Sequence, residues 1–98
     1  ADQTNALIES VSGVDLKVYP NPAKEKMTIH LESNQDFSLE VEVLSLLGTV
    51  ESVVRPVQLS QGIHEFELNA QEMKLSKGVY YLRLQVNGLE KQWKICFN

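Results

Sequence analysis

Apolar side chains recur at every second residue in several short runs of this chain. The clearest runs are residues 26–32 and 78–86. Successive side chains of a β-strand point to opposite faces of a sheet, so this period of two indicates strands with one buried face. Shorter or less regular runs of the same kind cover residues 16–19, 38–46, 49–54, 62–68 and 89–97.

Turn residues separate these runs. Gly48 follows a break in the alternation at residues 44–47, which indicates a bulge or a tight hairpin. Asn87 and Gly88 lie between two alternating runs, and this pair favours a type I′ hairpin because both positions need positive φ. The single helix candidate, residues 69–75, is too short to be stable alone and is expected to form one turn.

About seven short strands with almost no helix predict an all-β domain. We expect an antiparallel β-sandwich rather than a small barrel, because the two inner faces of a sandwich need such alternating stripes. A length of 98 residues with 43% hydrophobic residues fits one globular domain. Residues 1–14 are expected to be a leader or linker without strand structure, and residues 15–98 the folded domain.

Composition excludes several classes of function. The formal net charge is −4 and the basic residues form no stripe, which argues against nucleic-acid binding. We expect no direct membrane span, because no apolar run is long enough, and residues 1–12 lack the pattern of a signal peptide. Cys96 is the only cysteine, so an internal disulfide and a zinc site built on cysteine pairs are both excluded.

No catalytic or metal-binding constellation is evident. His30 and His64 have no clustered partners, Cys96 has no histidine near it in the sequence, and Ser45 lies in no glycine-flanked elbow. We therefore expect no enzymatic activity and no cofactor. An outer strand face with Val79, Tyr81 and Arg83 is either exposed or covered, and the pattern does not separate these alternatives.

The sequence Tyr-Pro-Asn-Pro at residues 19–22 predicts a rigid extended crossing. Proline has no N–H for a β-ladder, and each proline biases the preceding residue toward extended backbone. We expect this segment to end a strand at a sheet edge, where missing donors cost little.

Four ordered segments resemble a known family: residues 18–23 followed by the strand 27–29, then residues 41–48, 75–82 and 91–97. Together they are similar to the C-terminal sorting domain of cargo proteins of the bacterial type IX secretion system. Two positions differ from the family pattern: Ser45 stands where the family often has Asp, and residue 98 is Asn rather than Lys.

The resemblance implies an immunoglobulin-like sandwich that directs its cargo through the outer-membrane translocon. It implies the translocon and its outer-membrane shuttle proteins as partners, transit through the periplasm, and arrival at the cell surface or release. It also implies a cell-surface sortase that cleaves within or upstream of residues 1–13 and joins the cargo to lipopolysaccharide. We expect a monomer or a weak edge-strand dimer. Candidate recognition residues are Tyr19, Pro20, Asn21, Pro22, Gly48, Lys77, Gly78, Tyr80, Lys94, Ile95, Cys96, Phe97 and Asn98.

A second hypothesis is an immunoglobulin-like module that binds carbohydrate or protein and is appended to a secreted enzyme or adhesin. A platform of exposed aromatic side chains would favour it. Phe66, Tyr80, Trp93 and Phe97 instead fall on apolar stripes, which indicates core positions.

Overall fold

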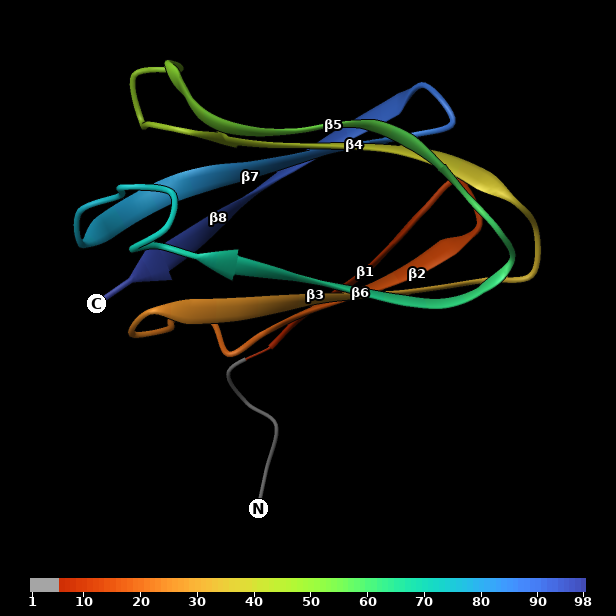
Figure 1. The fold of residues 1–98 in the computed structure, drawn as a ribbon, viewed down its shortest axis with the longest axis horizontal. Helices are drawn as coiled ribbons and strands as arrows, with labels where there is room; N and C mark the ends of the chain where they lie inside the picture. Colours follow the sequence, from red (N-terminus) through yellow and green to blue (C-terminus); the bar gives the residue numbers. More distant parts are fainter. Residues whose placement is uncertain (1–5) are drawn as a thin grey trace.

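A computed structural model of the chain describes residues 6–98, apart from the side chains of residues 52–56. Within this part, two sheets face each other as a sandwich (Figure 1). The strands are β1 (Leu7–Val11), β2 (Val14–Tyr19), β3 (Lys26–Ser33), β4 (Phe37–Leu44), β5 (Val50–Leu59), β6 (Gly62–Asn69), β7 (Gly78–Val86) and β8 (Leu89–Phe97).

Each sheet has four strands, in the orders β1-β2-β3-β6 and β5-β4-β7-β8, and all ladder neighbours are antiparallel. Without β1, the strands β2–β8 form a seven-stranded sandwich of three and four strands, which is an immunoglobulin-like arrangement. The predicted all-β sandwich is confirmed. The helix candidate forms one turn, in which Met73 N–H donates to the Asn69 carbonyl at 3.0 Å.

The core lies between the two inner faces. On β3, Met27, Ile29 and Leu31 are fully buried and alternate with partly exposed polar residues. On β7, Leu82 and Leu84 are fully buried in the same way. Each such side chain contributes about 1.5–3 kcal/mol by leaving water. The predicted period of two therefore identifies the buried face of both strands.

Strand β1 corrects the expectation that residues 1–14 have no strand structure, of which residues 1–5 lie outside the described residues. Leu7–Val11 pairs with β2 from Leu7↔Val18 to Val11↔Val14. The connecting residues Ser12 and Gly13 have φ values of 52° and 81°, as a tight primed hairpin turn requires. Val11 is 1% exposed, so the strand belongs to the core. The processing point in this region stays a prediction.

Residues 19–22 correct a second expectation. Strand β2 lies between β1 and β3 rather than at a sheet edge, and the chain bends at residues 20–22, with cis peptide bonds before Pro20 and Pro22. Both prolines follow the last ladder pair of β2, Tyr19↔Thr28, so their missing N–H groups leave this ladder intact. Beyond the bend, Ala23 forms a parallel bridge with Phe97 of the other sheet.

Two turns agree with the sequence. Gly48, with φ of 91°, closes the β4–β5 hairpin, and Asn87 and Gly88, with φ of 52° and 84°, close the β7–β8 hairpin. The outer face of β7 is partly exposed, and Val79 on it is 40% exposed. Residues 6–98 contain no helix that is long and apolar enough to cross a membrane.

Candidate recognition surface at one end of the sandwich

The segments singled out in the sequence lie at one end of the sandwich. Strand β4 ends where β7 begins, since Leu44 pairs with Tyr81, and β7 begins where β8 ends, since Gly78 pairs with Phe97. The end of β2 joins them through the Ala23 bridge. We call this the convergent end, on the left of Figure 1; it comprises residues 19–26, 45–50, 70–80 and 94–98.

The side chain of Asn21 connects two of these segments. Its Oδ1 accepts a hydrogen bond from the Cys96 N–H at 3.1 Å, and its Nδ2 donates to the Lys94 carbonyl at 3.3 Å. A carboxamide offers one acceptor and two donors, so Asn21 supplies both kinds of group that an open strand edge needs.

The backbone of Ala23 continues this pairing. Its N–H donates to the Cys96 carbonyl at 2.9 Å, and its carbonyl accepts from the Asn98 N–H at 2.8 Å. Ala23 is only 2% exposed. Strand β8 is an edge strand of its sheet, so residues 21–23 satisfy backbone groups that would otherwise face solvent. We call residues 21–23 the edge cover.

Tyr80 joins β7 to the end of β8. Its hydroxyl donates to the Ser76 carbonyl at 2.6 Å, and its ring meets Phe97 edge-to-face at 6.4 Å between centroids. Tyr80 is 8% exposed and Phe97 1%, so both act as core residues. Gly78 begins β7 with φ of 148°, a backbone conformation that favours glycine, although a β-carbon added there would meet no other atom within 4 Å.

The β4–β5 hairpin carries a feature that the sequence reasoning missed. Leu47 is 95% exposed and Leu46 55%, next to Gly48 at the tip. Ser45 holds the turn, because its Oγ accepts from the Thr49 N–H at 3.1 Å and its carbonyl accepts from the Gly48 N–H at 2.9 Å. Two leucines within a turn sequence are the signal that could have indicated exposed apolar surface.

The structure thus divides the predicted recognition residues into three groups. Tyr80, Ile95 and Phe97 are buried, and their side chains are not available on the surface of the folded domain. Tyr19, Asn21, Gly78 and Cys96 are half-buried. Pro20, Pro22, Gly48, Lys77, Lys94 and Asn98 are exposed.

Positive charge gathers at the convergent end of this acidic chain. Of the seven lysines in the sequence, five lie there and are all exposed: Lys24, Lys26, Lys74, Lys77 and Lys94. The polar turns at this end therefore present ammonium groups to any partner that approaches it, although Glu25 and Glu72 lie in the same turns.

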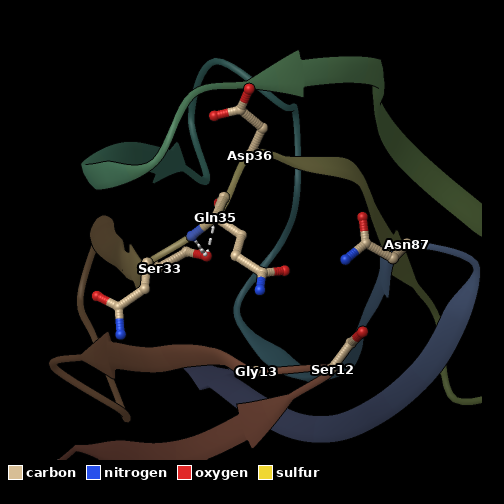
Figure 2. A pocket seen from close by; sticks show the side chains of 7 residues that line it. Ser12, Gly13, Ser33, Gln35, Asp36 and Asn87 are labelled. Carbon is tan, nitrogen blue, oxygen red and sulfur yellow. Dashed lines mark hydrogen bonds between the residues drawn. The ribbon is translucent and has the colours of Figure 1, made fainter.

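The opposite end carries a polar hollow of about 190 Å³ between three turns (Figure 2). The Gln35 side chain points into it, between the turn at Ser12 and Gly13 and the side chain of Asn87. Ser33 Oγ donates to the Gln35 carbonyl at 2.7 Å, and Asn87 Oδ1 accepts from the Ser38 N–H at 3.0 Å. These polar groups hold turns together, which explains their placement without a ligand.

One ion pair crosses the outer face of β4 and β7. Arg83 Nε donates to the Glu42 carboxylate at 2.6 Å, and this hydrogen bond raises the pKa of Arg83 above its ordinary value. His30 Nδ1 lies 2.8 Å from Glu65 Oε2 on the other sheet. Among the described side chains, those of residues 6–51 and 57–98, no group of three His, Cys, Asp or Glu is placed to hold a metal ion.

The fold is an immunoglobulin-like sandwich. At its convergent end, segments that are distant in the sequence together form one surface. Residues 17–98 match the secretion system C-terminal sorting domain, and the chain belongs to this family. It is a sorting signal of the type IX secretion system, whose cargo reaches the cell surface or is secreted. No curated protein matches the chain. Strand β1 precedes the first matched residue.

Proposed function

We propose that the convergent end is the surface by which the type IX machinery recognises this domain, and that the domain performs no chemistry of its own. One observation supports the proposal above others. The four segments that resemble the family are far apart in the sequence, yet each of them passes through this place or ends there, where Asn21 bonds to Lys94 and Cys96.

The positive charge at the convergent end indicates that the partner presents an acidic surface. Lys77 and Lys94 are exposed at the convergent end of a chain with a formal net charge of −4. A translocon or shuttle protein with an acidic surface would attract this end and orient the domain before contact. Leu46 and Leu47 at the same end add apolar area that a protein partner can bury.

Processing by a cell-surface sortase, with transfer of the cargo to lipopolysaccharide, follows from the family resemblance. We propose that the cleaved bond precedes β1. Leu7–Val11 is paired along its length with β2, and proteases cleave unpaired exposed backbone more readily than a strand in a ladder. Since Leu7 pairs with Val18 near the end of β2, the chain enters the sandwich at the convergent end. The domain passes through the periplasm before this step.

The alternative of a carbohydrate-binding module has less support. The three tyrosines, three phenylalanines and one tryptophan are all buried or half-buried, so these residues form no open stacking platform. A glycan affinity with no export would favour this alternative.

A charge reversal at the convergent end tests the proposal. Residues 1–98 are fused to the C-terminus of a neutral periplasmic reporter in a bacterium that has the type IX system, and surface delivery is measured. We expect the double variant Lys77→Glu and Lys94→Glu to lose roughly tenfold or more in export, as removal of complementary interfacial charges does. Lys91→Glu is the matched control, because Lys91 is also exposed on β8 but pairs with Leu84, away from this end. Equal export of both variants would contradict the proposal.

A further inference from the structure

The outer edge of β8 is already occupied by the chain itself along residues 94–98. Along residues 94–98 the groups used by the edge cover are the Lys94 carbonyl, the Cys96 N–H, the Cys96 carbonyl and the Asn98 N–H. In an antiparallel ladder, every second residue directs its N–H and its carbonyl toward the same edge. Residues 94, 96 and 98 therefore present acceptors and donors in alternation, as on any free strand edge. A polypeptide backbone in extended form is the chemistry that matches this series.

The contacts that hold the edge cover on β8 are separate from those that hold β8 in its own sheet. Ala23↔Phe97 is a single parallel bridge outside the named strands, whereas β8 pairs with β7 at every position from Gly78↔Phe97 to Val86↔Leu89. Pro20, Pro22 and Lys24 beside the bridge are exposed. The edge cover can therefore leave β8 while β8 remains in its sheet, at the cost of four hydrogen bonds and the burial of Ala23.

We propose that the edge cover is exchangeable, and that an extended strand of the secretion machinery replaces it on the same four backbone groups of residues 94–98. The inference rests on the proposed function, because it assigns a binding mode to the convergent end. In the free domain the edge cover also prevents residues 94–98 from pairing with a second copy of the chain. Displacement exposes the edge only when a partner strand is present to pair with it.

A reversible cross-link tests the exchange. Lys24 and Asn98 each follow the parallel bridge Ala23↔Phe97 by one residue and are exposed, so we expect the two thiols of Lys24→Cys with Asn98→Cys to lie side by side. The native thiol is removed by Cys96→Ser. We expect the disulfide to form in the purified 98-residue domain and its oxidised reporter fusion to be exported roughly tenfold less or worse, as blocking a main-chain interface does.

Reduction supplies the internal control. Addition of a membrane-permeant reductant should restore export of the same fusion relative to its oxidised form. The single variants Lys24→Cys and Asn98→Cys, each with Cys96→Ser, should show the same export in both conditions. Normal export of the cross-linked form would overturn the exchange. Failure of the two thiols to cross-link would overturn the closed arrangement from which the inference starts.

A second measurement does not depend on export. Asn21→Ala removes two of the four bonds, so the Cys96 amide should exchange its hydrogen about 5–10-fold faster, while the Leu82 amide on β7 should be unchanged. Unchanged protection of Cys96 would contradict an edge cover held by Asn21. If the lysine reversal blocks export and the cross-link does not, recognition at the convergent end stands and strand exchange falls. If the cross-link blocks export and the lysine reversal does not, the charge-based recognition falls.

Discussion

The amide oxygen of Asn21 accepts a hydrogen bond from the backbone N–H of Cys96, a residue 75 positions further along the chain. This contact joins the bend after β2 to the edge of β8, and the Asn21 amide nitrogen extends it to the Lys94 carbonyl. One side chain thus connects the two sheets of the sandwich at the convergent end.

Asn21→Ala should lower the free energy of unfolding by about 1–2 kcal/mol, because it leaves a donor and an acceptor of β8 without this partner. Asn21→Asp keeps an acceptor for Cys96, but its second carboxylate oxygen would face the Lys94 carbonyl oxygen, so we expect a loss at least as large. Urea unfolding followed by Trp93 fluorescence measures both. If Asn21→Ala is as stable as the wild type, the contact contributes nothing to the fold.

Tyr80 combines a hydrogen bond and a ring contact, and the two can be separated. Tyr80→Phe removes only the hydroxyl that donates to Ser76, and we expect a loss of about 1 kcal/mol. Phe97→Ala removes the ring that meets Tyr80 and leaves a cavity, for which we expect about 3–5 kcal/mol. Tyr81→Phe, on the partly exposed outer face, is the control and should change little. Thermal unfolding by circular dichroism gives this ranking, and a larger loss for Tyr80→Phe than for Phe97→Ala would contradict it.

Strand β1 should contribute to stability although it lies before the family match. Val11→Ala should cost about 1–2 kcal/mol, because Val11 is 1% exposed and two methyl groups leave the core. Ile8→Ala on the same strand should cost little, because Ile8 is 64% exposed. Guanidinium unfolding of both variants measures the difference. Equal stability of the two would mean that β1 is not packed as described.

The ion pair of Arg83 and Glu42 should contribute less to the free energy of unfolding than its short contact suggests. The two side chains are 26% and 18% exposed, and ion pairs near the surface contribute about 0–1 kcal/mol. A double-mutant cycle with Arg83→Gln and Glu42→Gln should give a coupling energy in this range that falls at high salt. A coupling that is insensitive to salt would contradict an electrostatic origin.

Much of the fold was predictable because its signals are local. The alternation of Met27, Ile29 and Leu31 depends only on the geometry of a strand, and it identified the buried face of β3. The turn at Asn87 and Gly88 was predictable because positive φ favours these residue types. The sandwich followed from counting such elements, and the family followed from the order of four short segments.

Other features were missed because their stability comes from distant partners. Leu7–Val11 has a weak pattern of its own and becomes a strand through its ladder with β2. The exposure of Leu46 and Leu47 depends on how the β4–β5 hairpin projects from the sheet; two leucines beside a turn glycine indicate such a surface but do not fix how far it projects. Likewise, the sequence could propose Tyr80, Ile95 and Phe97 for recognition, but only packing shows that these side chains are buried.

The sequence by itself determined the strands, their buried faces and the family, because a period of two and a set of motifs are properties of neighbouring residues. The tertiary structure alone decided that Asn21 meets Cys96, that Ala23 pairs with Phe97, and that five lysines share one end of the sandwich. Contacts of this kind depend on sheet order and strand register. These are set by the joint packing of all the strands, and no local pattern contains them.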